Sequence, residues 1–328
     1  MYMAKEDRYE HAAFRRSGRS GLMLPAVSLG LWHNFGSTGC FETMRQMCRT
    51  AFDAGITHFD LANNYGPEAG SAEINFGRIL KEDLKPYRNE ILISTKAGYE
   101  MWPGPYGDHG SRKYLMASLD DSLKRMGLDY VDIFYHHRPD PDTPLEETMT
   151  ALRDIVLSGK ALYVGLSNYD GERMTEAATM LKDMHVPFVI NQNRYSIFDR
   201  TIEHNGLKEA AAREGKGIIT FSPLAQGLLT EKYLHGIPAD SRIRTDGRFL
   251  NENALSEERM AKIQALADLA RQRGQSLAQM ALSWVLKDAP ITSVLIGASR
   301  PAQILENLKC VENTSFTEEE LRIIDAHS

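Results

Sequence analysis

The sequence has little cysteine and no pattern that would pair it. Its 328 residues contain three cysteines, Cys40, Cys48 and Cys310. An odd number without paired spacing argues against a disulfide framework and against a cysteine-rich zinc site. A His-Glu-x-x-His motif is also absent, so we predict no metal site. Free thiols are typical of a protein in a reducing compartment, and we therefore expect a cytoplasmic protein.

Long apolar runs and a strong net charge are also missing. No apolar stretch is long enough to span a bilayer, and no apolar core follows the polar opening residues, so we expect neither a signal peptide nor a membrane partner. The net charge is -6 at pH 7, without any basic block. This balance argues against nucleic acid as a partner.

The chain does have the composition and periodicity of a large α/β protein. It is 42% apolar and 25% charged, which is enough to build a full core. Short apolar stretches alternate eight times with helical patterns. The predicted strands are 27–31, 57–61, 91–95, 131–135, 162–166, 188–190, 217–221 and 293–296. No composition break divides them, and no Gly-x-Gly-x-x-Gly turn supports a doubly wound sheet.

We therefore predict a single domain over 1–328, folded as a (β/α)8 TIM barrel. Residues 14–25 have the turn residues of an N-terminal β-hairpin, which could plug the bottom of the barrel. A long polar loop is expected over about 222–253. Helical patterns at 257–273 and 318–325 predict additional helices in the C-terminal part.

Four titratable side chains stand where consecutive predicted strands end. They are Asp60, Tyr65, Lys96 and His137. The strand ends of a barrel converge on one face, so these side chains should meet there. The neighbouring His136 should point away, because side chains alternate along a strand. A buried ion pair between Asp60 and Lys96 that only holds the barrel together is the alternative reading.

These residue types suggest proton transfer to a carbonyl oxygen. A free tyrosine has a pKa of about 10, and an adjacent ammonium group should lower it. Asp60 would keep Lys96 charged, and His137 could donate a hydrogen bond to a substrate oxygen. None of the four can supply a hydride, so a nicotinamide cofactor is implied.

Three motifs resemble the aldo-keto reductase family: the stretch 55–66 around Asp60 and Tyr65, the stretch 119–133, and the strand that ends at Lys96. The resemblance covers about 14–324 and implies a (β/α)8 barrel, NADPH as cofactor, Tyr65 as general acid, and support from Asp60, Lys96 and His137. The segments 30–36, 101–107 and 221–229 resemble the branch that includes bacterial L-glyceraldehyde 3-phosphate reductases and potassium-channel β subunits.

That branch implies a set of cofactor-binding residues. In order along the chain, they are Trp32, Asp60, Ser167, Asn168, Gln192, Phe221, Ser222, Leu224, Gln226, Gly227, Lys232, Arg242, Gly297, Ser299, Gln303, Glu306 and Asn307. The resemblance assigns the carboxamide to Ser167, Asn168 and Gln192. Phe221 would stack on the nicotinamide, and Lys232 and Arg242 are the candidates for the 2′-phosphate.

Trp32, Trp102 and Tyr106 are candidates for the substrate wall. The expected activity is NADPH-dependent reduction of small aldehydes, with L-glyceraldehyde 3-phosphate as the first candidate substrate and methylglyoxal and similar small aldehydes as side substrates. Arg112 or Arg138 could contact a substrate phosphate, or be a surface charge. An NADP(H)-binding sensor with slow turnover and a Schiff-base aldolase on Lys96 are the alternatives. A homo-oligomer is expected by resemblance.

Overall fold

The computed structural model describes residues 2–234, 236–237 and 255–328. Within these ranges, eight parallel strands close into a barrel in the order β10-β3-β4-β5-β6-β7-β8-β9. The strands are β3 (Val27–Gly30), β4 (His58–Asp60), β5 (Leu92–Ala97), β6 (Val131–His136), β7 (Ala161–Ser167), β8 (Phe188–Arg194), β9 (Gly217–Phe221) and β10 (Ile291–Ile296). The predicted (β/α)8 barrel is therefore confirmed.

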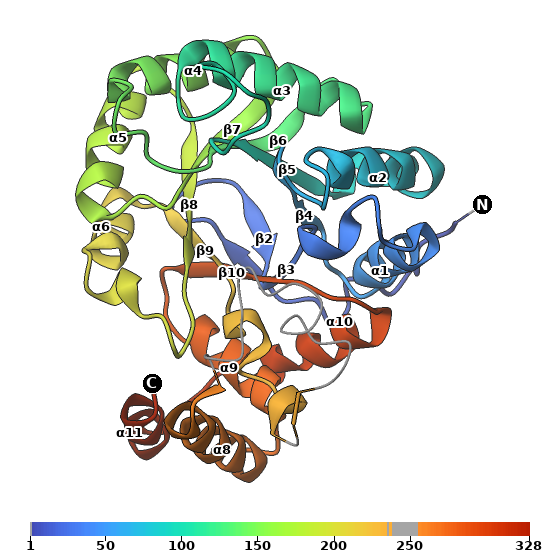
Figure 1. Cartoon of the computed structure of the whole chain (residues 1–328), viewed down its shortest axis with the longest axis vertical. Helices are drawn as coiled ribbons and strands as arrows, with labels where there is room; N and C mark the ends of the chain where they lie inside the picture. The colour runs from blue at the N-terminus through green and yellow to red at the C-terminus, as the bar shows by residue number, and fades with distance from the viewer. Residues whose placement is uncertain (1, 235, 238–254) are drawn as a thin grey trace.

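Helices surround the barrel on its outside (Figure 1). They are α1 (Phe41–Asp53), α2 (Ser71–Ile79), α3 (Arg112–Met126), α4 (Leu145–Leu157), α5 (Gly171–Asp183), α6 (Leu207–Glu214), α8 (Glu257–Gln272), α9 (Leu277–Leu286), α10 (Pro301–Leu308) and α11 (Glu318–Ala326). The helix predicted at 112–126 has the same boundaries in the structure. Ser111 caps its first turn, and Gly127 ends it with a left-handed backbone conformation. None of the helices in the described ranges is long and apolar enough to cross a membrane.

A hairpin of β1 (Phe14–Arg16) and β2 (Met23–Pro25) lies across the barrel, as predicted. Figure 1 shows β2 inside the ring of strands. Leu22 and Leu24 are buried and join an interior cluster with residues from β6, β8, β9 and β10. The Ser17 hydroxyl donates to the carbonyl of Val189 at 2.9 Å. The hairpin therefore plugs the end of the barrel where the strands begin.

The segment between α2 and β5 forms a π-helical turn, Leu80–Leu84, followed by a 3-10 helix, Lys85–Glu90. Asp83 ties this segment to α1, because it is buried and accepts hydrogen bonds from Arg45 and Arg49 of that helix. The predicted long loop at 222–253 lies in part outside the described residues.

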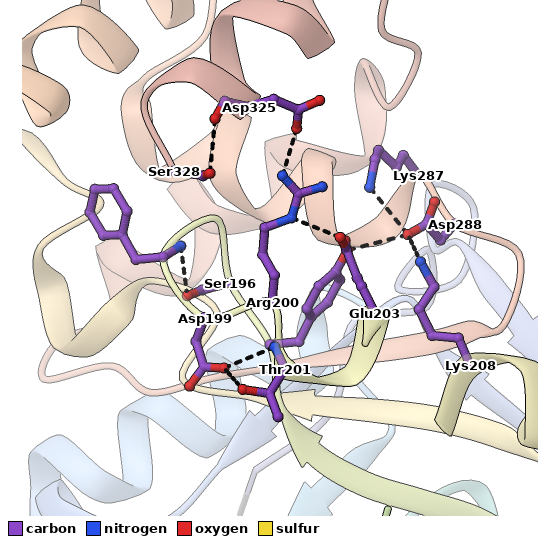
Figure 2. Close-up of polar contacts among 12 residues, drawn as sticks. Ser196, Asp199, Arg200, Thr201, Glu203, Lys208, Lys287, Asp288, Asp325 and Ser328 are labelled. Atoms are coloured by element: carbon purple, nitrogen blue, oxygen red, sulfur yellow. Dashed lines mark hydrogen bonds and ion pairs between the residues drawn. The ribbon is translucent and has the colours of Figure 1, made fainter. Parts of the chain in front are cut away.

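A polar network joins the segment after β8 to the C-terminal helices. We call it the Tyr195 network; its residues are Tyr195, Arg200, Glu203, Lys208, Lys287, Asp288 and Asp325. Figure 2 shows its charged members, with Asp288 between two lysines and Arg200 between two carboxylates. Asp288 is 2.6 Å from the ammonium of Lys208 and 3.1 Å from that of Lys287. Arg200 bonds Glu203 at 2.8 Å and Asp325 of α11 at 2.6 Å.

Candidate active site

The four titratable residues lie at the carboxyl ends of three adjacent strands. Asp60 is the last residue of β4, Lys96 is near the end of β5, and His137 directly follows β6. Tyr65 lies in the turn between β4 and α2. Because β4, β5 and β6 are neighbours in the barrel, their ends bring the four side chains together. The predicted convergence is therefore present in the structure.

The Asp60–Lys96 ion pair is the buried centre of this site. The Lys96 ammonium donates to Asp60 Oδ2 at 2.5 Å and to the carbonyl of Leu61 at 2.7 Å. The other oxygen of Asp60 accepts from Ser94 at 2.7 Å and from Gln192 at 3.1 Å. A buried pair is tolerated when its remaining donors and acceptors are satisfied in this way. Burial lowers the pKa of Lys96, and the charge of Asp60 opposes that effect.

Tyr65 is held beside the pair and keeps its hydroxyl available. The Lys96 ammonium lies 3.4 Å from the phenol oxygen and 4.9 Å from the ring centre. The expected lowering of the phenol pKa is wrong for the chain alone. Burial raises the pKa of Tyr65 well above its usual value, and the charge of Asp60 raises it further. The main reason is burial, which disfavours the charged phenolate, and the negative charge of Asp60 acts in the same direction. Tyr65 is therefore a neutral acid with its proton in place.

His137 is a neutral hydrogen-bond donor at the same site. Its ring packs edge-on against Tyr65, with centroids 5.9 Å apart, and against Tyr99 at 4.7 Å. Burial lowers the pKa of His137 well below its ordinary value, and the charge of Lys96 lowers it further. Its Nδ1 is buried without a hydrogen-bond partner among the described residues. An imidazole in this state can donate to a carbonyl oxygen without becoming charged.

The structure places His136 away from the site, as predicted. Its Nδ1 is 2.7 Å from the hydroxyl of Tyr169. Two residues of the site were missed by the sequence reading. Ser94 is two positions before Lys96, and the alternation along a strand could have identified it. Tyr99 follows Gly98 in a loop, where no periodicity applies.

The predicted carboxamide-binding residues are at the ends of β7 and β8. Ser167 and Gln192 are both buried and lie opposite each other in register, and Gln192 donates to Asp60. Asn168 adopts a left-handed conformation, with φ of 61°, and its amide donates to the carbonyl of His137 at 2.9 Å. These amides and the hydroxyl surround the mouth of the barrel beside the four titratable residues, which fits recognition of a polar carboxamide.

The turn after β9 has an unusual backbone. Ser222, Ala225 and Gln226 have φ of 54°, 47° and 61°, and Gly227 has φ of 100°. Successive residues of right- and left-handed conformation can form backbone concavities that bind anions. Within this turn, the N–H of Ala225 donates to the carbonyl of Ser222 at 2.9 Å. Phe221, at the end of β9, is partly exposed and can stack on a flat ring. Leu224, also predicted, accepts from the N–H of Gly227 at 2.8 Å.

The predicted adenosine-binding residues lie after β10 and along α10. Gly297 is exposed, with open space where a Cβ would be. Both the N–H and the hydroxyl of Ser299 donate to Gln303. Further along α10, Glu306 pairs with Lys309 at 2.9 Å, and Asn307 is buried. Lys232 is exposed in the 3-10 helix Glu231–Tyr233, and Arg242 lies outside the described residues.

Of the three residues predicted to line the substrate site, one packs its ring against a titratable residue of the site in the part of the chain that the structure describes. Trp32 lies 6.4 Å from the ring of Tyr65. Trp102 packs on Tyr114 at 5.3 Å, and Tyr106 is exposed beside Lys113. Both of these partners belong to α3, so the loop that contains Trp102 and Tyr106 lies along that helix. The same loop reaches the site through Asp108, which bonds Arg138, and the guanidinium of Arg138 lies over the ring of Tyr99.

The sequence model of the Aldo/keto reductase family matches residues 26–328. A curated relative from Escherichia coli (strain K12), L-glyceraldehyde 3-phosphate reductase, is 56% identical over 330 residues, which cover 100% of this chain and 95% of that protein. A probable voltage-gated potassium channel subunit beta from Oryza sativa subsp. japonica is 35% identical over 304 residues, with 91% of each chain covered.

Among solved structures, a thermostable aldo-keto reductase in complex with the inhibitor epalrestat is similar along nearly the whole chain. The TM-score is 0.75 at 30% sequence identity, and the match covers 96% of this chain and 100% of that chain.

Proposed function

The chain belongs to the aldo/keto reductase family, and we propose from this membership and its site that it reduces L-glyceraldehyde 3-phosphate and, less efficiently, methylglyoxal and similar small aldehydes. The identity of 56% to a protein of that name supports the phosphorylated substrate. The protein is an oxidoreductase with NADP(H) as its cofactor. When bound, the cofactor supplies the hydride that the side chains cannot.

The residues at the barrel mouth fit this cofactor. Ser167, Asn168 and Gln192 would hold the carboxamide, and the ring of Phe221 would cover the nicotinamide. The left-handed turn at 222–227 would hold the pyrophosphate, and the open surface at Gly297 leaves room for the adenosine end. Lys232 and Arg242 stay our candidates for the 2′-phosphate.

The side chains of the site then handle the proton. Tyr65 donates its phenolic proton to the carbonyl oxygen as that oxygen becomes an alkoxide. His137, kept neutral by burial, donates a hydrogen bond to the same oxygen and orients it. The Lys96 ammonium, fixed by Asp60, stabilises the phenolate left behind. The observation that carries the proposal is this contact of 3.4 Å between Lys96 and a tyrosine hydroxyl that remains available.

The direct test is the decrease of NADPH absorbance with L-glyceraldehyde 3-phosphate, its D-isomer and methylglyoxal. We expect turnover that is fastest with the L-isomer. The same rate for both isomers would reject the substrate proposal but leave the reductase class intact. No oxidation with any of the three aldehydes, at an enzyme concentration where NADPH binding is saturated, would contradict the proposed reaction.

An NADP(H)-binding sensor is the second candidate, and the 35% identity to a probable channel subunit favours it. The complete set of Asp60, Tyr65, Lys96 and His137 supports the enzyme instead. A Schiff-base aldolase is disfavoured, because Lys96 is fully buried and bonded to both Asp60 and Leu61. Tight NADPH binding with turnover slower than about one per minute would favour the sensor.

The proposal also covers the domain organisation, cellular location and partners of the protein. The substrate is a small molecule. We infer one barrel domain over 1–328, a cytoplasmic location and a homo-oligomer, with neither membrane nor nucleic acid as a partner. The modest net charge of -6 and three free cysteines support the location and the lack of a nucleic-acid partner. Light scattering on the purified protein tests the oligomeric state.

A further inference from the structure

We propose that Arg138 binds the phosphate group of the substrate, and that Asp108 occupies its guanidinium until the substrate arrives. The inference rests on the proposed function, because it concerns the phosphate of L-glyceraldehyde 3-phosphate. It assigns the recognition of that group to one side chain and names the residue that competes for it.

The position of Arg138 is fixed by its contacts with the catalytic face. It directly follows His137 in the chain. Its Nε donates to the carbonyl of Gly98 at 2.6 Å, and its guanidinium lies 4.4 Å from the ring centre of Tyr99. The other neighbour of that ring is His137, at 4.7 Å. One aromatic ring therefore separates the guanidinium from the imidazole that would hold the aldehyde oxygen.

This separation suits a three-carbon sugar phosphate. Such a substrate has its aldehyde at one end and its phosphate at the other, with a short chain of atoms between them. With the carbonyl oxygen at His137 and Tyr65, the phosphate has to lie beside the neighbouring side chains. Among these, Arg138 carries a permanent positive charge and has donors suited to phosphate oxygens.

The guanidinium is partly engaged and partly available. Its Nη2 donates to both oxygens of Asp108, at 2.8 and 2.9 Å. Its Nη1 has no hydrogen-bond partner among the described residues. About 30% of the Arg138 side chain and 28% of the Asp108 side chain are exposed. An incoming anion can therefore reach the pair from solvent, and it finds one free donor before any contact breaks.

A phosphate is a stronger partner for this guanidinium than a carboxylate. It offers three oxygens and up to two negative charges, while Asp108 offers two oxygens and one charge. Asp108 lies on the loop after β5, where Gly98, Gly104 and His109 all have positive φ. His109 lies 3.7 Å from Asp108 and 3.8 Å from Asp140, so Asp140 is a second carboxylate close to the pair.

The other arginines considered are worse placed. Arg112 pairs with Asp154 at 2.6 Å on the outer side of α3 and α4. Arg194 lies 5.8 Å from the ring of Phe221, which is the position expected for the nicotinamide. Neither contacts His137 directly or through one ring in the part of the chain that the structure describes.

The experiment compares KM for L-glyceraldehyde 3-phosphate with KM for methylglyoxal, which has no phosphate. In Arg138→Gln, we expect the ratio of the two KM values to rise about 10- to 100-fold, because a charged hydrogen bond is lost only with the phosphorylated substrate. In Asp108→Asn, the ratio should fall, since the competing charge is removed. Arg112→Gln is the matched control and should leave the ratio at its wild-type value.

A structural role for Arg138 predicts a different result. It would change both KM values by the same factor in Arg138→Gln, and Asp108→Asn would damage the enzyme in the same direction. Either outcome overturns the proposal. If Arg138→Gln does not fold, Arg138→Lys replaces it; the ratio should then rise less, because lysine keeps the charge but not the planar donors.

A second readout separates this inference from the proposed function. sn-Glycerol 3-phosphate should inhibit methylglyoxal reduction competitively in the wild type, and glycerol should not. The inhibition should weaken in Arg138→Gln and strengthen in Asp108→Asn. If the wild type does not reduce L-glyceraldehyde 3-phosphate, the substrate proposal fails while this measurement still tests Arg138. Inhibition that is equal in all three proteins would overturn the role of Arg138 alone.

Discussion

The active site and the Tyr195 network each combine a tyrosine, a carboxylate and a lysine, but the tyrosine hydroxyl is hydrogen-bonded differently in the two regions. In each, a tyrosine hydroxyl lies near a carboxylate that is paired with a lysine. Tyr65 has Lys96 at 3.4 Å, and Lys96 is already bound to Asp60. Tyr195 instead donates its hydroxyl hydrogen to Glu203 and lies 3.3 Å from Asp288. The first hydroxyl is available for a substrate, and the second is occupied by the protein.

The surroundings explain why the two regions do different things. Asp60 is satisfied by Ser94, Gln192 and Lys96, so it does not compete for the proton of Tyr65. Glu203 accepts from Arg200 with one oxygen, and its other oxygen accepts the hydrogen bond of the Tyr195 hydroxyl. Residue type alone therefore does not identify a proton donor. A tyrosine becomes one where the nearby carboxylate is already satisfied by other donors and leaves the hydroxyl hydrogen available.

The strongest test replaces each tyrosine in turn. Tyr65→Phe should lower kcat by about 10²- to 10⁴-fold, because the general acid is lost, and it should leave NADPH binding intact. Tyr195→Phe should leave kcat unchanged and lower the free energy of unfolding by about 1–3 kcal/mol, because Glu203 loses a donor. Steady-state kinetics and urea denaturation measure these effects. Equal kinetic losses in both variants would remove the distinction between the regions.

The lysines give the next largest contrast, in stability. Lys96→Met leaves Asp60 as a fully buried carboxylate without its cation, so we expect the free energy of unfolding to fall by about 3–5 kcal/mol. Lys208→Met removes a partly exposed partner of Asp288, which keeps Lys287, and should cost less than about 1 kcal/mol. Urea denaturation of both variants checks the order. Losses of similar size would contradict the difference in burial on which the comparison rests.

Acid should weaken the barrel interior before it weakens the Tyr195 network. Burial lowers the pKa of His58 to about 4, between the hydroxyls of Ser28 and Ser94. The unfolded chain binds this proton near pH 6.5 and the folded chain only near pH 4. Stability should therefore fall by roughly 1.4 kcal/mol per pH unit in this window. Lys208 holds the pKa of Asp288 below its ordinary value against the opposing effect of burial, so its contribution is lost only in stronger acid.

The measurement is the free energy of unfolding from pH 7 to pH 4 in the wild type and in His58→Asn. The slope of the unfolding free energy against pH should decrease in the variant by the amount that corresponds to about one proton. Part of the slope should remain, because burial also lowers the pKa of His136 to about 4. His11→Gln, at an exposed position, is the control and should keep the wild-type slope. An unchanged slope in His58→Asn would show that this histidine is not the titrating group.

The smallest effect is expected at the outer end of the network. Asp325→Asn removes the contact between α11 and Arg200, whose guanidinium also bonds Glu203. The Asp325 side chain is 54% exposed, so the cost should be below about 1 kcal/mol, and kcat should not change. Thermal unfolding in low and high salt measures it. A loss above about 2 kcal/mol would mean that the network carries more of the fold than its exposure indicates.

The strand ends could be predicted from the sequence because apolar periodicity places them. Asp60, Lys96 and His137 each follow or end an apolar stretch, so their convergence follows from the barrel alone. The state of Tyr65 could not be predicted, because its pKa depends first on how deeply the phenol is buried and then on the nearby charge of Asp60. Tyr99 and Asp108 were missed for a similar reason. They lie in a loop whose path is set by Gly98, Gly104 and Arg138, and no repeating pattern encodes those contacts.

The hairpin that plugs the barrel has a consequence for the order in which the protein is built. It is synthesised well before Val189, Gly215 and Leu286, which hold it in place. The first barrel strand, β3, likewise pairs with the last, β10. A growing chain therefore presents an unsupported plug and an open strand edge until β10 has emerged. Closure of the ring and seating of the hairpin are late events, so shortened chains should be aggregation-prone.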